Sequence, residues 1–164
     1  MGDLVIAAIA LGSNLGDRAA HLNHAISRLR EFLGDLRVSR FYDTVPVGAP
    51  GPQPLFLNAA AVGQAGLPAW NLLEALLAVE QERGRARPYP NAARSLDLDL
   101  ILFGDATIEE PGLIVPHLRF RERRFVLEPL AEIAPDMKDP VTGQTIAQLL
   151  EHSLRRYHEG HDER

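Results

Sequence analysis

Two carboxylates lie two residues apart within residues 94–99, which read Arg-Ser-Leu-Asp-Leu-Asp. The alternation of apolar and polar residues predicts a β-strand, so Asp97 and Asp99 should face the same way, with Cα atoms about 6.5 Å apart. Neighbouring carboxylates attract cations, and proteins usually hold Mg²⁺ through one or two carboxylates together with substrate phosphates. The alternative is the solvated face of a half-buried strand. Because the same face should continue into the apolar Ile101 and Phe103, we interpret it as the wall of a cleft that is polar at one end.

Arginines cluster on both sides of this strand. Residues 83–94 contain four arginines and no acid, and residues 119–124 contain four more beside a single glutamate. In a chain of net charge −5, such local clusters favour a compact anion, because guanidinium groups can bind phosphate oxygens in a bidentate way. The overall acidity argues weakly against nonspecific binding of nucleic acid.

Length and composition are those of one globular domain. The chain has 164 residues, of which 46% are apolar, and we expect a single domain over residues 1–158 with a frayed tail over residues 159–164. The absence of cysteine excludes disulfides, thiolate metal sites and a cysteine nucleophile, and it fits a cytoplasmic location. The apolar run at residues 4–11 is too short to span a bilayer, so we expect no membrane association.

Hydrophobic periodicity predicts the elements that must position these residues. The predicted strands cover residues 4–11, 36–45, 55–63 and the segment of the two aspartates. The predicted helices cover residues 17–33 and 68–82, followed by an extended segment within 105–118 and helical stretches over 121–133 and 144–157. Gly34 should stop the first helix, and Pro68 should begin the second.

The first six elements follow the order strand, helix, strand, strand, helix, strand. This order predicts a split βαβ, or ferredoxin-like, α+β fold, in which an antiparallel sheet has helices packed on one face. The other face is then free to carry a site, and the C-terminal helices are additions. The fold hosts many functions and does not select a chemistry. The loop over residues 46–54, with four prolines and two glycines, is a common kind of place for ligand contacts.

Two polar side chains interrupt apolar patterns. Glu80 continues the apolar stripe of the second helix. Either the helix is ending and the carboxylate reaches solvent, or the carboxylate points at the basic loop or at the hydroxyls of a ligand. Asn58 lies within an apolar strand, and its amide could pin a neighbouring loop or pair with a heterocycle that has an amide-like edge. Phe56 shares its face and could stack on such a ring.

Three further signals are weak. The Gly12-Ser13-Asn14 turn could let backbone approach an anion, although it lacks the lysine and the spacing of a phosphate-binding loop. A lone histidine such as His117 is more often structural than catalytic, and Phe125 beside Arg123 could belong to the core or to a ligand site. No Ser-His-Asp spacing or zinc motif is present, which sets aside hydrolase triads and zinc sites.

Together the motifs resemble one family, the 6-hydroxymethyl-7,8-dihydropterin pyrophosphokinases of folate synthesis. The matching stretches run in order from residue 10 to about residue 133, and the Arg-x-Leu-Asp-Leu-Asp block is highly specific. They cover residues 10–18, 56–60, 80, 84–87, 94–99, 115–117 and 123–127. The resemblance implies a ferredoxin-like fold, which agrees with the order of elements.

The resemblance also implies a reaction, in which the pyrophosphoryl group of ATP moves to the hydroxymethyl oxygen of the pterin and AMP is released. Asp97 and Asp99 would hold two Mg²⁺ ions, and Arg85 and Arg94 would meet the triphosphate as catalytic residues. Contacts to ATP would come from Glu80, at the ribose, and from Arg87, Arg94, His117 and Arg123. The pterin would be bound at Gly12, Thr44, Val47, Phe56, Asn58 and Phe125, with the two phenylalanines on either side of its ring.

Some positions depart from the family's pattern. Residues 88–93 read Pro-Tyr-Pro-Asn-Ala-Ala and lack the usual Arg-Trp pair, so Tyr89 could replace the aromatic residue but nothing obvious replaces the arginine. Leu118 stands where an aromatic residue often follows the histidine, and Val45 and Val47 vary the usual proline and leucine. These changes bear on efficiency more than on identity, because loop closure and product release often limit turnover.

Two other classes of function stay open from the residues alone. Another Mg²⁺-dependent phosphotransferase or a nucleotidyl transferase could use the same aspartates, and would give ADP or pyrophosphate in place of AMP. A ferredoxin-like regulatory domain would explain the paired aspartates and the arginines poorly. An RNA-binding form of the fold is disfavoured, because no basic and aromatic strand motif is present. We expect a monomer whose partners are small-molecule substrates.

Overall fold

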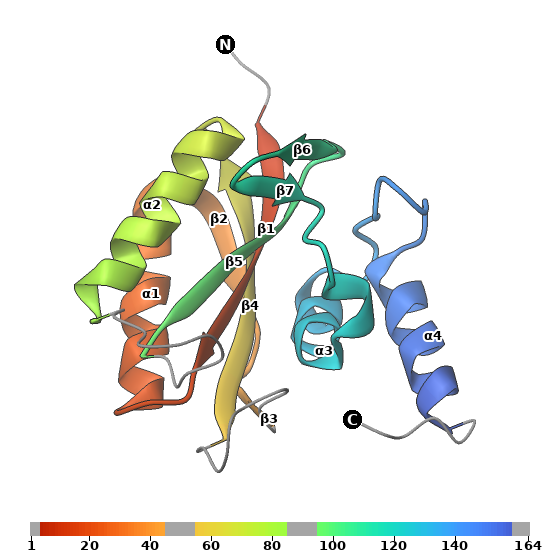
Figure 1. Cartoon of the computed structure of the whole chain (residues 1–164), viewed down its shortest axis with the longest axis horizontal. Coiled ribbons are helices and arrows are strands. Elements are labelled where there is room, and N and C mark those ends of the chain that lie inside the picture. Colours follow the sequence, from red (N-terminus) through yellow and green to blue (C-terminus); the bar gives the residue numbers. More distant parts are fainter. Residues whose placement is uncertain (1–3, 45–54, 85–94, 159–164) are drawn as a thin grey trace.

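One antiparallel sheet forms the centre of the fold. The computed structural model describes residues 4–44, 55–84 and 95–158. The strands of the sheet are β1 Val5–Ser13, β2 Leu33–Val38, β3 Tyr42–Thr44, β4 Phe56–Ala65 and β5 Asp97–Phe103. Their order is β2-β4-β1-β5, with β3 also paired to β4, and every pair is antiparallel (Figure 1). Strands β1 and β2, which α1 connects, have β4 between them, and strands β4 and β5, which α2 connects, have β1 between them. This arrangement confirms the predicted ferredoxin-like fold.

Two helices cover one face of the sheet, as predicted (Figure 1). They are α1 Arg18–Phe32 and α2 Ala69–Glu82. Asp17 caps α1, since its side chain accepts a hydrogen bond from the Ala20 N–H at 3.1 Å. The apolar stripes of both helices are buried against the sheet at Leu22, Ala25, Leu29, Leu72, Leu76 and Val79. Among the described helices, none has the length and apolar character that crossing a membrane requires.

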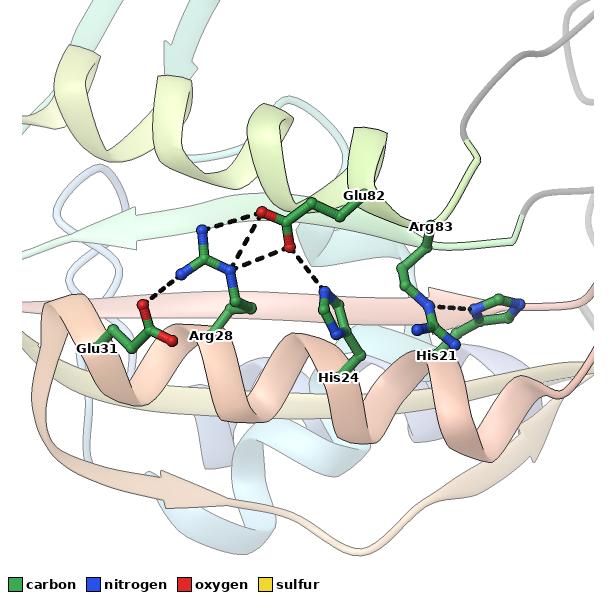
Figure 2. A network of polar contacts seen from close by, with 6 residues as sticks. All are labelled: His21, His24, Arg28, Glu31, Glu82 and Arg83. Carbon is green, nitrogen blue, oxygen red and sulfur yellow. Dashed lines mark hydrogen bonds and ion pairs between the residues drawn. The ribbon is translucent and has the colours of Figure 1, made fainter.

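A polar network joins these two helices at the C-terminal end of α2 (Figure 2). The Glu82 carboxylate accepts hydrogen bonds from Arg28 Nη2 at 3.0 Å and from His24 Nε2 at 2.7 Å. These bonds, that of Arg28 first, lower the pKa of Glu82 to about 2. Beside them, Arg83 Nε donates to Nδ1 of His21 at 2.9 Å, and burial followed by the charge of Arg83 lowers the pKa of His21. The network therefore ties the last turn of α2 to α1.

The other face of the sheet is partly covered by the C-terminal helices (Figure 1). The short 3-10 helix η1 Phe120–Glu122 leads into α3 Arg124–Ile133, and α4 Ile146–His158 packs beside α3. A second apolar core lies between this layer and the sheet, at Ala8, Ala60, Val62, Ile101, Leu102, Phe120, Leu127 and Leu130. The expectation of a free second face is therefore correct only for the part that α3 leaves uncovered.

A β-bulge changes which face the end of β5 presents. The pairing of β5 with β1 shifts register between Ala8 and Ile9, which inserts an extra residue into β5. Beyond the bulge, Phe103 packs in the core between the sheet and the helices α1 and α2, whereas Ile101 packs in the second core. The prediction that Phe103 shares the face of the two aspartates is wrong, because one inserted residue moves every later side chain to the opposite face.

Some element boundaries also differ from the prediction. The chain passes directly from α1 into β2, so Gly34 is a strand residue and does not stop the helix. The strand predicted over residues 36–45 is interrupted at Ser39, whose N–H donates to the Ala60 carbonyl while its hydroxyl accepts from the Ala60 N–H, both at 2.9 Å. The extended segment predicted within residues 105–118 is a hairpin of β6 Ile108–Glu110 and β7 Leu113–Val115.

Candidate active site

A row of residues crosses the sheet where three strands carry the predicted site. Asn58 of β4 lies opposite Gly12 of β1, and Gly12 lies opposite Asp97 of β5. Two residues further along β5, Asp99 lies opposite Ala10 of β1. Because side chains alternate along a strand, Asn58, Asp97 and Asp99 share the face that α3 partly covers. Glycine at the middle of the row means that no side chain separates the amide from the carboxylate.

The two aspartates form a set of oxygen donors that suits Mg²⁺. Asp97 and Asp99 are half-buried, whereas Leu98 between them is buried in the core under α1 and α2. The predicted alternation of side chains between the two faces of this strand is therefore confirmed. Among the described residues, no cluster of three or more His, Cys, Asp or Glu side chains could hold a metal by itself. Two half-buried carboxylates on one face suit an ion that takes its other ligands from water and substrate phosphates, as Mg²⁺ usually does.

Glu80 supports the strand that carries the aspartates. Its side chain is only 8% exposed, and its Oε2 accepts a hydrogen bond from the Leu98 N–H at 2.7 Å. Among the described strands β5 lies at the edge of the sheet, so the backbone N–H groups on its outer side have no neighbouring strand. The Glu80 carboxylate provides an acceptor for one of them. The alternative in which Glu80 reaches solvent is wrong, and its contact with ATP stays a prediction.

The Asn58 amide is held in a defined orientation. The hydroxyl of Thr44 on β3 donates to Asn58 Oδ1. The amide nitrogen lies over Gly12, where an added Cβ would be 3.1 Å from Nδ2 and 3.5 Å from the ring of Phe56. An amide that presents its NH₂ group beside an aromatic ring suits a flat heterocycle with an acceptor on its edge.

His117 and Arg123 lie near the aspartate end of β5. The backbone N–H of His117 donates to the Ile101 carbonyl at 3.0 Å, which joins the segment after β7 to β5. Burial, and then the charge of Arg123, lowers the pKa of His117, while the charge of Asp97 acts in the opposite direction. The Arg123 guanidinium carbon is 5.7 Å from the centre of the Phe125 ring. A guanidinium and an imidazole that could meet phosphate thus lie near Asp97, one of the two proposed metal ligands.

The predicted site residues fall into three groups. The first group, Glu80, Asp97, Asp99, His117 and Arg123, lies around β5, and Phe125 lies next to Arg123. Gly12, Thr44, Phe56 and Asn58 lie together at the ends of β1, β3 and β4. Arg85, Arg87, Arg94 and Val47 lie outside the described residues, as do Val45, Tyr89, the loops over 46–54 and 88–93, and the tail.

Two charged residues that contact β3, the strand of Thr44, were not found by the sequence analysis. Arg18, the first residue of α1, contacts Asp43 of β3, and Glu132 of α3 contacts Tyr42 of the same strand. These pairs are 25 and 90 residues apart, so no local pattern connects them. The one available signal is the place of Arg18, because a positive charge in the first turn of a helix is disfavoured by the helix dipole and indicates another partner.

The sequence matches a known family over most of its length. The model of the 7,8-dihydro-6-hydroxymethylpterin-pyrophosphokinase (HPPK) family matches residues 8–135. The chain belongs to this family. HPPK membership confirms the resemblance that the motifs indicated, and the matched range contains every predicted site residue.

Relatives in several organisms agree with this assignment to the HPPK family. The 2-amino-4-hydroxy-6-hydroxymethyldihydropteridine pyrophosphokinase of Synechocystis sp. is 42% identical over 147 residues, which cover 88% of this chain and 74% of that protein. The protein of the same name from Bacillus subtilis is 43% identical over 139 residues, which cover 84% and 83%. The folic acid synthesis protein fol1 of Schizosaccharomyces pombe is 37% identical over 89% of this chain but only 20% of its own length.

Solved structures support the fold. The wild-type HPPK-DHPS chain of Plasmodium falciparum superposes with a TM-score of 0.78 at 16% sequence identity. The match covers 99% of this chain and 47% of that chain, so this HPPK chain spans about half of it. At this identity the likeness shows the ferredoxin-like fold alone.

Proposed function

We propose a division of labour among the residues of this pyrophosphokinase. As a member of the HPPK family, the chain transfers a pyrophosphoryl group to 6-hydroxymethyl-7,8-dihydropterin in folate biosynthesis. In our proposal ATP is the donor, Asp97 and Asp99 hold the metal, and Asn58 binds the pterin. The observation that carries the proposal is the row Asn58–Gly12–Asp97, since it sets an amide donor and the carboxylates on one face with no side chain between them.

The chemistry needs positioning and charge stabilisation more than covalent help from the protein. Asp97 and Asp99 would hold two Mg²⁺ ions, which would supply positive charge beside the transferring phosphates and make the hydroxymethyl group more acidic. The hydroxymethyl oxygen attacks the β-phosphorus, the bond to the oxygen that stays on AMP breaks, and the hydroxyl proton passes to solvent. The proposal therefore includes no dedicated general base and no covalent enzyme intermediate.

The remaining predicted residues bind and orient the two substrates. The triphosphate would be bound by Arg85 and Arg94. Further contacts to ATP would come from Arg87, Arg123 and His117, and from Glu80 of α2. Guanidinium groups suit this role because they stay charged and can bind phosphate in a bidentate way. The pterin would be bound by Gly12, Thr44, Val47 and Asn58, with its ring between Phe56 and Phe125.

The products of one incubation test this proposal. Purified protein would be incubated with Mg²⁺, ATP and 6-hydroxymethyl-7,8-dihydropterin, and AMP would be separated from ADP by chromatography. We expect AMP that depends on both Mg²⁺ and the pterin, together with a pterin that has gained a diphosphate. ADP or pyrophosphate instead would favour another phosphotransferase or a nucleotidyl transferase. Tight nucleotide binding without Mg²⁺, and no consumption of ATP, would favour a regulatory domain.

A monomeric state and a cytoplasmic location complete the proposal. The absence of cysteine fits a reducing compartment, where disulfides are rare. Light scattering on the purified protein should give a mass near 18.1 kDa. A mass of twice this value would contradict the monomer.

A further inference from the structure

The strand that orients Asn58 is weakly held by the sheet alone. β3 has three residues, and within the described parts of the chain it pairs with β4 only. Its last residue, Thr44, lies opposite Phe56 and donates its hydroxyl to Asn58 Oδ1. Because a short strand at the edge of a sheet has few backbone hydrogen bonds, the position of Thr44 depends on side-chain contacts from neighbouring elements.

Arg18 holds β3 from the side of α1. Its Nη1 donates to Asp43 Oδ1 at 2.8 Å and to the Leu55 carbonyl at 2.7 Å. Asp43 directly precedes Thr44, and Leu55 directly precedes Phe56. One guanidinium group thus joins the two strands at the residues next to the predicted pterin contacts, through charge-assisted bonds that are stronger than neutral ones.

Glu132 holds β3 from the side of α3. Its Oε1 accepts from the Tyr42 hydroxyl at 2.6 Å, and its Oε2 accepts from the Arg40 backbone N–H at 3.1 Å. The hydrogen bond from Tyr42 is the main cause of a lowered pKa for Glu132, which keeps the carboxylate ionised and able to accept. Because Tyr42 and Asp43 are adjacent in a strand, their side chains leave on opposite faces. The two contacts therefore hold β3 from both faces of the sheet.

We propose that Arg18 and Glu132 are positioning residues for pterin binding, which hold β3 between α1 and α3 so that Thr44 fixes the Asn58 amide. Neither side chain touches the substrate. With Thr44 bonded to Oδ1, the amide presents Nδ2 over Gly12, and a displaced β3 would let the amide turn. The inference rests on the proposed pterin site, and it predicts a loss confined to the pterin and not shared by ATP.

Steady-state kinetics of matched variants test this inference. Arg18→Ala removes the first contact and Tyr42→Phe removes the main bond of the second. Each should raise KM for the pterin about three- to tenfold, because the site must be ordered during binding, and leave KM for ATP within about twofold. Arg28→Ala is the control, since Arg28 lies on the same helix, is also 30% exposed and also forms an ion pair. It should change neither KM.

An unchanged pterin KM in both variants, or an equal rise in both KM values, would overturn the inference. Should Arg18→Ala not fold, Asp43→Asn decides in its place, because it weakens the same ion pair by removing one charge. Backbone amide exchange of β3 without substrate is an independent readout. Exchange at residues 42–44 should be faster in Arg18→Ala and Tyr42→Phe than in Arg28→Ala, and equal rates would overturn the inference. A wild-type protein without pterin-dependent AMP would instead contradict the proposed function.

Discussion

Gly12 creates the space on which the proposed site depends. It lies between Asn58 and Asp97 in the sheet, and any larger residue would project toward the amide. The glycine does not have a positive φ, so its role is to leave room and not to allow an unusual backbone conformation. This is a reason for glycine that the sequence alone could not provide, because it depends on two strands that are distant in the chain.

Gly12→Ala should impair pterin binding more than folding. The added Cβ would lie 3.1 Å from Asn58 Nδ2 and 3.5 Å from the Phe56 ring, so the amide must move from the orientation that Thr44 sets. We expect KM for the pterin to rise about tenfold, as expected when a group that orients a ligand is displaced. Gly34→Ala is the control, because its Cβ would meet its nearest neighbour at an ordinary 3.5 Å. Equal kinetic effects of the two variants would contradict this explanation.

At the residue scale, local patterns were predictable and long-range partners were not. The alternation of half-buried and buried residues around Asp97 and Asp99 depends on one strand only, and the structure confirms it. The burial of Glu80 depends on the Leu98 N–H, which is 18 residues away, so its place in the apolar stripe left two interpretations open. The face of Phe103 depends on a bulge that forms only against β1.

Among the elements, α1 and α2 are joined by charges whose effect depends on pH (Figure 2). The pKa of Glu82 falls from 4.5 to about 2 on folding, so its bonds stabilise the protein fully above pH 4.5 and are lost as the pH falls toward 2. Glu82→Gln should therefore lower Tm at pH 6, and the difference from the wild type should shrink between pH 4.5 and 2. Thermal unfolding over this range measures it.

Glu74→Gln is the control for this prediction. Glu74 lies on the same helix, is exposed and has no hydrogen bond or ion pair among the described residues. Its replacement should leave Tm unchanged at every pH. A difference between wild type and Glu82→Gln that stays constant from pH 6 to 2 would show that the network does not act through the charge of Glu82.

The segment before α4 is fixed by a fully buried carboxylate. Asp139 is 0% exposed and accepts hydrogen bonds from Arg121 of η1 and from Val141 and Thr142. Burial alone would raise the pKa of Asp139, but these bonds lower it. Asp139→Asn should reduce the free energy of unfolding by about 2–4 kcal/mol, because it leaves Arg121 without its opposite charge. Urea denaturation checks this against the exposed Asp136→Asn, and equal losses would contradict it.

At the element scale, helices were predicted more accurately than strands. The bounds of α1 and α2 lie within a residue of the predicted ones, because capping and apolar periodicity are encoded locally. The interruption between β2 and β3 was not predicted. It arises because the Ser39 hydroxyl replaces a backbone acceptor for Ala60, which is 21 residues away.

The whole molecule has two apolar cores, one on each face of its sheet. The order of elements was sufficient to predict the ferredoxin-like topology, because few arrangements join such elements with short connections. A helical stretch over residues 121–133 was also predicted, but not the face on which it packs. On the face that α3 partly covers, Gly12, Asn58, Asp97 and Asp99 of the proposed site lie toward the ends of β1, β4 and β5.

The most direct test of the account is the rate of pterin-dependent AMP formation in aspartate variants. Asp97→Ala and Asp99→Ala should each lower turnover by about 10²–10³-fold or more, because in our proposal each removes a ligand of the metal that would stabilise the transferring phosphates. Their unfolding curves should match the wild type, and Asp105→Ala, an exposed residue in the turn after β5, should keep full activity. Substantial turnover in either purified Asp97→Ala or Asp99→Ala would contradict the account.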